Sequence, residues 1–474
     1  MKEDYDLVII GAGSAGIMPA RFARRLGLSV ALVEKSRIGG DCTWTGCVPS
    51  KSLLKAASVA HQMRSADRYG LVPSAAPVDL GSVMSRVRAT MQELYQAESP
   101  EAMESEGIDV VMGEARFLDP HTVRVQEPSD RDLTARRYLV AIGAKPLVPP
   151  IRGIEDVEYL TYETVWDLEE LSGRLTVVGG GPIGCELAQA FCRLGSSVTL
   201  LEAAGRVLLQ DEPEASALVT QKLTDDGIDL RLGAALEAVA QGPGISLSLA
   251  SDGQLETDAL LLAVGRRADL AGLGLGEANV DYQSSGIKID RNLRTSQVHI
   301  YAAGDCTGGF QFTHYAGYQG VMAVRNAFLP LNSRAVLEHV PWATFTDPEV
   351  AHVGLTEAQA RERHGPKAVV SNLPMSRVDR AVIEGEAGGF IKLVHLPNGK
   401  LLGTTVVAPR AGEMVHEWSV ALDRGLKLQH LARSVHVYPT YSIANQQLTV
   451  QLTADRMLSG SLGKVIRRLA RGLW

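Results

Sequence analysis

The chain has 474 residues, 45% of them hydrophobic and 21% charged, and this composition indicates a globular protein of two to four domains. Its formal net charge of −7 argues against a nucleic-acid binder, which usually shows a basic face or a basic total. The sequence has no run of ~20 apolar residues and opens on the acidic segment MKEDYDLVII, so we expect neither a membrane helix nor a signal peptide, and a cytoplasmic protein.

The start of the chain predicts a dinucleotide-binding unit. An apolar run at 5–10 leads into a glycine-rich turn and a helical pattern, and a second apolar run at 29–33 ends in Glu34. In such a βαβ unit the glycines let the backbone approach a pyrophosphate at the helix N-terminus, and the acid binds a ribose hydroxyl. The glycines of the turn are Gly11, Gly13 and Gly16.

The segment 39–51, GGDCTWTGCVPSK, carries two cysteines, Cys42 and Cys47, at the expected N-terminus of a helix and close to Lys51. The helix dipole and a lysine both stabilise a thiolate, and a dithiol placed against a flavin can exchange electrons with it. We therefore predict a redox-active pair rather than an inert buried one. The other cysteines are expected to be structural; they are Cys185, Cys192 and Cys306.

A second fingerprint occupies 175–202, where an apolar run, a glycine turn and a helical pattern are followed by a strand that ends in Glu202. Two fingerprints in full βαβ context predict two dinucleotide sites and a hydride path between two cofactors. A carboxylate such as Glu202 accepts hydrogen bonds from a free 2′-hydroxyl and repels a 2′-phosphate, and a single arginine, Arg206, follows it, so NADH is favoured over NADPH. The glycines of this turn are Gly179, Gly181 and Gly184.

Three short apolar strands are expected to complete the nucleotide-binding lobes. Those at 138–143 and 259–265 end in glycine, and the one at 300–305 ends in Asp305, which could hydrogen-bond a polyol or a phosphate-bearing ligand. After 341 the character changes to alternating strands and helices without a glycine fingerprint, and the segment 329–333 marks the boundary. The two terminal glycines are Gly143 and Gly265.

The segment GGDCTWTGCVPSK resembles the redox centre of the class I pyridine nucleotide-disulfide oxidoreductases, the family of glutathione reductase, dihydrolipoamide dehydrogenase and mercuric reductase. The order of motifs agrees over nearly the whole chain, and 341–356 resembles the start of the family's dimerisation domain. The resemblance implies an α/β fold of two Rossmann-like domains plus an α+β dimerisation domain, in a homodimer. The implied domains are 1–150 with 271–335 for FAD, 151–270 for NAD(P), and 336–474 for the interface.

The resemblance also assigns roles to single residues. Cys47 is implied to face the flavin as a thiolate, and Cys42 to face the substrate as the interchange sulfur. Lys51 is implied to sit near the reactive edge of the flavin and to pair with Glu186. The implied FAD-binding residues are Gly11, Gly13, Gly16, Glu34, Lys35, Gly40, Thr43, Lys51, Ala115, Gly143 and Asp305, and the implied NAD-binding residues are Gly179, Gly181, Gly184, Glu202 and Gly265. No resident metal site is predicted.

The chain departs from the thiol-substrate branch of the family at two positions of one catalytic motif. Those members carry His-Pro-Thr-x-x-Glu, whereas this chain has Tyr438 in place of the histidine and Ile443 in place of the glutamate. A tyrosine with a pKa near 10 cannot cycle protons at neutral pH as imidazole does. Mercuric reductases resemble the chain at Tyr438 and at 379–393. They also carry a cysteine pair near the C-terminus, which the last residues of this sequence lack. Their N-terminal metal-binding domain is not expected here.

These motifs predict an FAD-dependent NAD(P)H oxidoreductase that passes electrons through Cys42 and Cys47 to a small acceptor such as a metal ion or a quinone. One alternative is a dihydrolipoamide- or glutathione-type thiol enzyme with an unusual acid–base arrangement. Another alternative is a slow-turnover flavoprotein sensor. The retained dithiol argues against it, because a protein that only binds its cofactors needs no redox-active cysteines.

The last residues form a basic cluster interleaved with apolar positions. They fit either a short amphipathic helix on a membrane surface or a solvated chain end, which base rates favour. The basic residues are Lys464, Arg467, Arg468 and Arg471, and the apolar ones are Leu462, Val465, Ile466, Leu469, Leu473 and Trp474.

Overall fold

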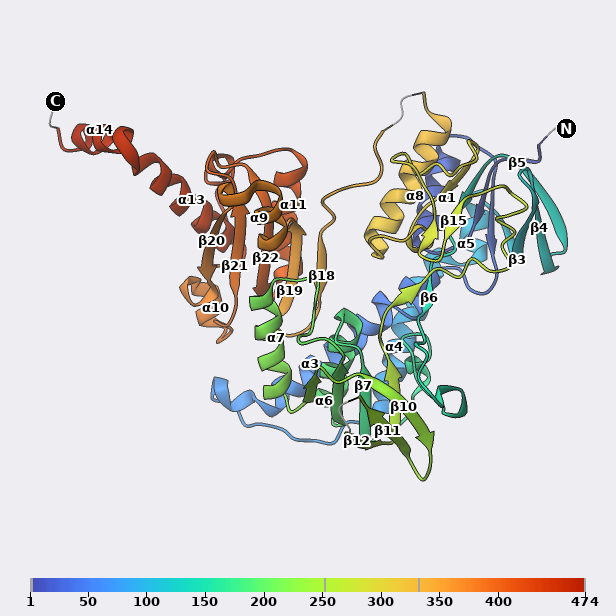
Figure 1. Cartoon of the computed structure of the whole chain (residues 1–474), viewed down its shortest axis with the longest axis horizontal. Helices are drawn as coiled ribbons and strands as arrows, with labels where there is room; N and C mark the ends of the chain where they lie inside the picture. The colour runs from blue at the N-terminus through green and yellow to red at the C-terminus, as the bar shows by residue number, and fades with distance from the viewer. Residues whose placement is uncertain (1–2, 251–252, 331–332, 473–474) are drawn as a thin grey trace. The chain divides into compact units, whose positions relative to one another are not determined.

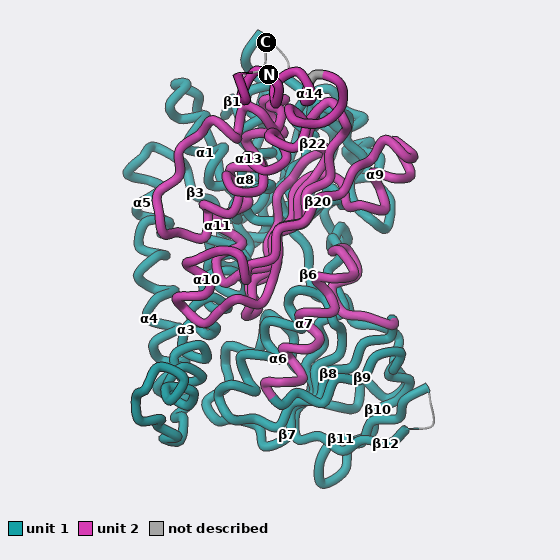
Figure 2. Tube along the Cα trace, turned by 90° about the vertical axis from the view of Figure 1, so that its left-hand side faces the viewer, with its two compact units in different colours: residues 1–204, 227–337 teal, residues 205–226, 338–474 magenta. Residues whose placement is uncertain are grey.

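The computed structural model describes residues 3–250, 253–330 and 333–472, so part of the predicted boundary at 329–333 and the apolar residues Leu473 and Trp474 lie outside the described residues. The chain divides into two compact units, 1–204 with 227–337 and 205–226 with 338–474 (Figure 2). The segment 205–226 thus groups with the C-terminal part of the chain, and the division into three domains stays a prediction.

The first unit is built on a six-stranded sheet in the order β1-β2-β3-β4-β5-β17, with β1 also pairing β5. The pairs β1–β2, β2–β3, β1–β5 and β5–β17 are parallel, as the predicted βαβ unit requires, whereas β4 pairs antiparallel with both β3 and β5. The strands are β1 (Tyr5–Ile10), β2 (Val30–Glu34), β3 (Asp109–Asp119), β4 (Thr122–Pro128), β5 (Arg131–Val140) and β17 (Ile300–Ala302).

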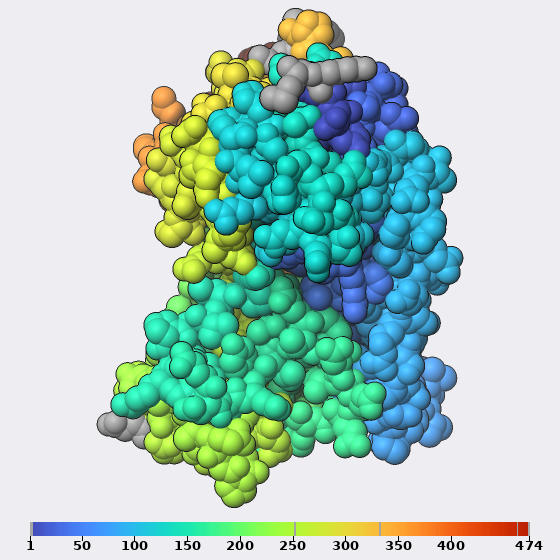
Figure 3. Space-filling view, turned by 90° about the vertical axis from the view of Figure 1, so that its right-hand side faces the viewer, coloured from blue at the N-terminus to red at the C-terminus, as the bar shows by residue number. Residues whose placement is uncertain are grey.

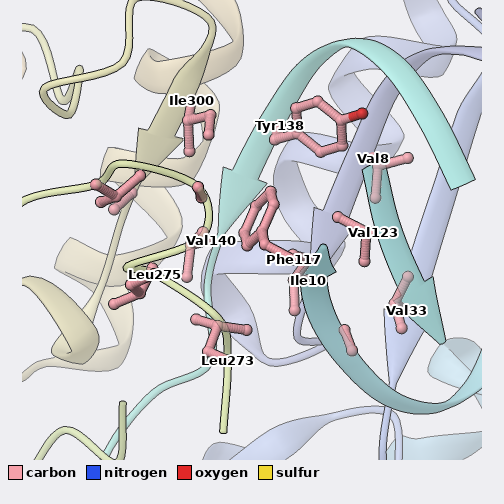
Figure 4. Packing of buried hydrophobic residues seen from close by; sticks show 14 of the residues in the cluster. Val8, Ile10, Val33, Phe117, Val123, Tyr138, Val140, Leu273, Leu275 and Ile300 are labelled. Carbon is pink, nitrogen blue, oxygen red and sulfur yellow. The ribbon is translucent and has the colours of Figure 1, made fainter. Parts of the chain in front are cut away.

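Alternation along β1 divides its side chains between the two faces of this sheet. Leu7 and Ile9 join the core under helices α1 (Ser14–Arg25) and α8 (Thr313–Phe328). Val8 and Ile10 point to the opposite core, which Figure 4 shows around Phe117, Tyr138 and Leu273. Because both faces are covered, β1 and β2 read in the sequence as continuous apolar runs. In Figure 3 the cyan-to-teal segment 109–140 lies at the surface beside the yellow segment 270–290.

A second, four-stranded parallel sheet in the same unit has the order β13-β7-β8-β9 and carries the second fingerprint. Its strands are β7 (Arg174–Val178), β8 (Ser197–Glu202), β9 (Asp229–Leu232) and β13 (Ala259–Leu262), and α6 (Pro182–Leu194) follows the glycine turn. An antiparallel meander of β10 (Leu236–Gln241), β11 (Ile245–Leu249) and β12 (Gln254–Thr257) was not predicted. Buried and partly buried residues alternate along β11, which fits a sheet with one covered face.

Short elements complete the first unit. Two helices, α2 (Gly40–Trp44) and α3 (Cys47–Arg64), hold the cysteine pair, and α3 packs against α6 and α4 (Leu80–Tyr95). The remaining elements are α5 (Pro100–Ser105) and the two-residue strands β6 (Lys145–Pro146), β14 (Arg266–Arg267), β15 (Tyr282–Gln283) and β16 (Gly286–Ile287).

The second unit is a five-stranded antiparallel sheet, β18-β19-β22-β21-β20, with its core centred on the fully buried Trp418. This is the α+β arrangement predicted from the alternating segments after residue 341. Its strands are β18 (Trp342–Thr344), β19 (Glu349–Gly354), β20 (Val369–Pro374), β21 (Phe390–His395) and β22 (Leu401–Ala408). Its helices are α7 (Pro213–Asp225), α9 (Glu357–His364), α10 (Asp379–Ile383), α11 (Ala411–Asp423), α12 (Leu428–Leu431), α13 (Ile443–Leu458) and α14 (Gly460–Ala470) (Figure 1).

Candidate active site

The two predicted cysteines flank a tight turn between two helices. Cys42 lies in α2, and Cys47 is the first residue of α3. The turn closes because the backbone N–H groups of Thr45 and Gly46 both donate to the carbonyl of Asp41. A Cβ on Gly46 would lie 2.8 Å from that carbonyl oxygen, so the turn requires glycine there. Both cysteines are free thiols, they hydrogen-bond each other, and Cys47 is exposed.

The two thiols differ in acidity. The hydrogen bond from Cys42 lowers the pKa of Cys47 to about 6 against the opposing effect of desolvation by the atoms around its sulfur, with further help from Thr313 and the charge of Lys51. The same hydrogen bond, together with burial, raises the pKa of Cys42. The helix N-terminus at Cys47 also favours an anion. These opposite pKa shifts favour a reduced pair with the proton on Cys42 and the negative charge on Cys47.

Lys51 lies one helical turn after Cys47 in α3, and its Nζ is 2.7 Å from Oε2 of Glu186 in α6. The predicted pairing of these two residues is therefore present. The ion pair links the helix of the cysteine pair to the helix of the second fingerprint, with the Glu186 side chain 7% exposed and that of Lys51 38% exposed. Lys51 stabilises the Cys47 thiolate, and Glu186 opposes it, so the pair sets the charge beside the sulfur.

Thr313, at the start of α8, is a contact that sequence reasoning missed. Its Oγ1 lies 3.2 Å from Sγ of Cys47 and helps to lower the pKa of that thiol. The two residues are 266 positions apart, and no local pattern marks a threonine at a helix start as a thiolate ligand. The motif AAGD, eight residues upstream, was the only signal that this part of the chain approaches the site.

Replacing Thr313 with valine is expected to raise the pKa of Cys47 by about one to two units, because a hydrogen bond to a charged group contributes roughly 1.5–3 kcal/mol and one pKa unit is about 1.4 kcal/mol. Thiolate absorbance against pH in the reduced protein measures this shift. Thr90→Val, which removes an exposed hydroxyl bonded within its own helix, is the matched control and leaves the titration unchanged. An unaltered titration in Thr313→Val contradicts the contact.

A cavity of about 480 Å³ in the first unit gathers the first fingerprint, the cysteine turn and the end of β17. Gly11 has a φ of +103°, and a Cβ there would meet the carbonyl of Ala141 at 2.4 Å, so only glycine lets the chain turn beneath the cavity. Glu34 accepts backbone hydrogen bonds from Ala12 and Ser36, each at 2.9 Å, which fixes its carboxylate at the rim. The predicted FAD residues that line the cavity are Gly11, Gly13, Glu34, Lys35, Gly40, Ala115, Gly143 and Asp305.

Three predicted FAD residues do not line this cavity. Gly16 serves helix packing, because a Cβ on it would lie 1.9 Å from the carbonyl oxygen of Gly11. The Thr43 hydroxyl is buried and donates to Glu98 at 2.9 Å. Lys51 lies beside Cys47 and pairs with Glu186. Glycine-lined backbone, a helix N-terminus and a fixed carboxylate are the features that hold a dinucleotide, so the cavity fits FAD.

Arg266 organises the polar end of the cavity and was not predicted. Its guanidinium pairs with Asp305 at 2.5 Å and with Asp41, the residue before Cys42, and donates to the Tyr162 hydroxyl at 3.0 Å. Burial raises the pKa of Asp305 while Arg266 opposes that shift. One side chain thus ties the cysteine turn to the end of β17. The sequence predicted an apolar strand at 259–265 and gave no role to Arg266, the residue that follows it.

The second fingerprint repeats the geometry of the first. Gly179 has a φ of +109°, and Cβ atoms on Gly179 and Gly184 would meet the carbonyls of Ala263 and Gly179 at 2.5 and 1.8 Å. Gly181 faces open space, which leaves its backbone accessible to a ligand. Glu202 accepts from the backbone N–H groups of Gly180 and Ala204 at 2.6 and 2.7 Å, as Glu34 does in the first fingerprint. The last predicted residue, Gly265, adopts a φ of +124° just after β13.

Tyr438 lies in the second unit, before α13. Its hydroxyl donates to Asp379 at 2.8 Å, and this hydrogen bond raises the pKa of Tyr438, so the phenol is a weaker acid than usual. Two residues earlier, His436 Nε2 lies 2.9 Å from Oε2 of Glu417, which also accepts from Asn445. An imidazole–carboxylate pair therefore lies close in sequence to the position where thiol-substrate relatives carry their histidine.

The remaining cysteines differ in burial. Cys185 and Cys306 are fully buried and donate to backbone carbonyls, and burial raises the pKa of Cys306 to about 12. Both have the inert, structural character that the sequence predicted. Cys192 is partly buried on α6.

Models of known families match almost the whole chain. Residues 5–320 match the pyridine nucleotide-disulphide oxidoreductase model, and 340–448 match the dimerisation domain of the same family. The chain belongs to the pyridine nucleotide-disulfide oxidoreductases. Family members use FAD and a pyridine nucleotide, and the dimerisation-domain match fits the predicted homodimer.

Similar proteins of this family have more than one activity. The chain is 39% identical to a mercuric reductase of Bacillus cereus over 96% of its own length and 72% of that protein. It is 32% identical to a dihydrolipoyl dehydrogenase of Bacillus subtilis over 92% and 96%. A solved structure, the Cu(II) complex of the HOCl-induced flavoprotein disulfide reductase RclA from Escherichia coli, superposes with a TM-score of 0.85 at 30% identity, covering 95% of this chain and 100% of that one.

Proposed function

We propose that the protein is an FAD-dependent NAD(P)H oxidoreductase that passes electron pairs through Cys42 and Cys47 to a small acceptor such as a thiophilic metal ion or a quinone, as a mercuric-reductase-like enzyme. The observation that carries the proposal is the geometry of the cysteine turn: Cys42 and Cys47 flank one turn beside the dinucleotide cavity, and Thr313 Oγ1 lies 3.2 Å from Sγ of Cys47. Reduction of a disulfide by two electrons with uptake of one proton gives one thiol and one thiolate. The opposite pKa shifts of Cys42 and Cys47 suit this product.

The residues of the chain divide the chemistry between them. Bound FAD supplies a two-electron relay between the nicotinamide and the dithiol. Reduction of the Cys42–Cys47 disulfide takes up two electrons and one proton, which Cys42 keeps while Thr313 and Lys51 hold the Cys47 thiolate. When an acceptor takes the two electrons, the disulfide forms again. The proton of Cys42 passes to solvent when the acceptor is a metal ion, and to the acceptor, together with a second proton from solvent, when it is a quinone. Arg266 and Asp305 keep the cysteine turn beside the cavity.

The second unit supports an acceptor that requires no proton shuttle. Tyr438 stands at the position of the catalytic histidine, and its hydrogen bond to Asp379 raises its pKa further from neutrality. A metal ion bound by thiolates needs electrons rather than protons, and mercuric reductases are among the relatives most like this chain. A second relative, RclA, is connected with a metal ion because its solved structure is a Cu(II) complex.

One observation favours the thiol-disulfide alternative. The His436–Glu417 pair, 2.9 Å apart and partly buried, has the imidazole–carboxylate chemistry that an interchange thiol uses for acid–base catalysis. Dihydrolipoyl dehydrogenases are also relatives at 32% identity. A thiol substrate would then depend on His436 rather than on Tyr438.

The nicotinamide we propose is NADH. Two backbone N–H groups fix the Glu202 carboxylate at the end of β8, where it would accept from a free 2′-hydroxyl and repel a 2′-phosphate. Arg206, the single arginine that follows, donates to the backbone carbonyls of Leu208, Leu209 and Asp211. The Arg206 guanidinium thus already donates to carbonyls of its own loop, which does not favour binding of a 2′-phosphate.

Acceptor specificity is tested by anaerobic turnover of the full chain with NADH and NADPH against Hg²⁺, Cu²⁺, a soluble quinone, lipoamide and glutathione disulfide. We expect turnover with a metal ion or quinone, faster with NADH, and unchanged in His436→Gln, because these acceptors need no imidazole. Rapid reduction of a disulfide that falls at least about tenfold in His436→Gln, with Tyr438→Phe neutral, establishes the thiol alternative. Flavin reduction without turnover of any acceptor points to a sensor.

A further inference from the structure

The last described helix, α14 (Gly460–Ala470), has two chemically opposite faces. With 3.6 residues per turn, Val465, Ile466 and Leu469 fall within about 100° of the helix circumference, and the basic residues fall within another ~100°, centred about 160° away. The basic residues of this face are Lys464, Arg467, Arg468 and Arg471. The sequence left open whether this segment is a helix or a solvated chain end, and the structure forms the helix.

The apolar face of α14 is open to solvent. Val465 and Leu469 are 52% and 45% exposed, and Ile466 is partly exposed. Figure 1 shows α14 continuing from α13 away from the five-stranded sheet, so the core of the second unit does not cover it. A helix that turns an apolar stripe to water is stable only marginally by itself and gains from a surface that takes up the stripe.

The charge around α14 identifies the kind of surface. The whole chain has a net charge of −7, but no Asp or Glu follows Asp455 in the sequence, so the segment that contains α14 is locally cationic. Arg467 donates to the carbonyl of Leu458 at 2.7 Å, which leaves the other cations on an exposed face. The dimerisation-domain match ends at residue 448, before α14 begins.

We infer that α14 binds the surface of an anionic lipid bilayer, with its apolar face in the acyl boundary and its basic face among the headgroups. A short helix with an apolar stripe and four or more cations opposite it is the form that interfacial membrane helices take. The contact is peripheral, because among the helices of the described ranges none is both long and apolar enough to cross a bilayer. It is independent of the function proposed above.

The full chain is mixed with sedimenting vesicles of phosphatidylcholine alone and of phosphatidylcholine with phosphatidylglycerol. Binding is expected only to the anionic vesicles, and high salt is expected to weaken it because salt screens the headgroup charge. Lys464→Gln with Arg468→Gln and Arg471→Gln is expected to lower the partition coefficient about a hundredfold. Arg467 is left in place because of its hydrogen bond to Leu458.

Two further variants keep the test specific. Arg363→Gln with Lys367→Gln and Arg424→Gln changes the net charge by the same amount at exposed positions away from α14 and should bind vesicles normally. Val465→Asn with Leu469→Asn keeps every charge and should reduce binding at least about tenfold, since it removes the apolar stripe. Flavin content and NADH-dependent flavin reduction, unchanged in all variants, show that each is folded.

Three outcomes overturn the inference. The first is equal binding to neutral and anionic vesicles, or none to either. The second is equal loss of binding in the α14 and the distant charge variants. The third is a dimer that dissociates in Val465→Asn with Leu469→Asn while vesicle binding persists, which assigns the apolar face to a second copy of the chain.

Discussion

Serine in place of Cys47 is expected to lower NADH-dependent turnover of every acceptor roughly a thousandfold or more, because the variant cannot form the disulfide through which electrons pass. The long-wavelength absorbance that a thiolate gives beside an oxidised flavin should be absent as well. Anaerobic titration with NADH, followed by absorbance, measures both effects.

Serine in place of Cys42 gives the matched control. Turnover is lost to the same degree, but the Cys47 thiolate persists, because a serine hydroxyl can still donate the hydrogen bond that lowers the pKa of Cys47. The long-wavelength band is therefore expected without any reductant. It should fade as the pH falls through about 6, since the thiolate form exists only above the pKa of Cys47.

The opposite spectra would reverse the roles of the two sulfurs. A band in Cys47→Ser and none in Cys42→Ser would make Cys42 the residue beside the flavin. Identical bleaching of the flavin in both variants and in the natural chain would show that neither cysteine exchanges electrons with it.

Methionine in place of Lys392 is expected to destabilise the second unit by about 3–5 kcal/mol, because removal of one partner from a buried ion pair leaves an uncompensated charge. Lys392 lies in β21 with its side chain 2% exposed, and its Nζ is 3.0, 2.8 and 2.7 Å from carboxylate oxygens of Glu212, Glu214 and Glu357. Glu212 is itself 3% exposed. The cluster joins the start of α7 to the sheet and to α9.

Thermal unfolding of the second unit should shift down by about 6–20 °C in Lys392→Met. The double variant Lys392→Met with Glu212→Gln should recover part of the loss, because it removes the stranded charge together with its partner. Arg116→Ala is the comparison at an exposed ion pair, with Glu277, and should change stability by less than about 1 kcal/mol. Equal effects at the two sites would contradict a special role for burial.

Much of the candidate site followed from local sequence. The roles of Gly11 and Gly179 could be predicted from the sequence, because each adopts a positive φ beside a carbonyl that excludes any side chain. The strands after them were readable because sheets covered on both faces need continuous apolar runs. Cys47 was readable because it begins a helix, and Lys51 because it lies one turn further along the same helix.

Contacts between distant segments could not be read in this way. The hydroxyl of Thr313 beside Cys47, the guanidinium of Arg266 between Asp41 and Asp305, and the carboxylates around Lys392 join elements whose proximity depends on strand order. The resemblance implied the thiolate on Cys47, and the tertiary structure supplies its cause, since the hydrogen bond between the two sulfurs raises the pKa of Cys42 and lowers that of Cys47. The sequence by itself determined which chemical groups are available, because glycine turns and helix starts depend on neighbouring residues. The tertiary structure decided their charge and their partners, because desolvation and electrostatics depend on everything that surrounds a group in space.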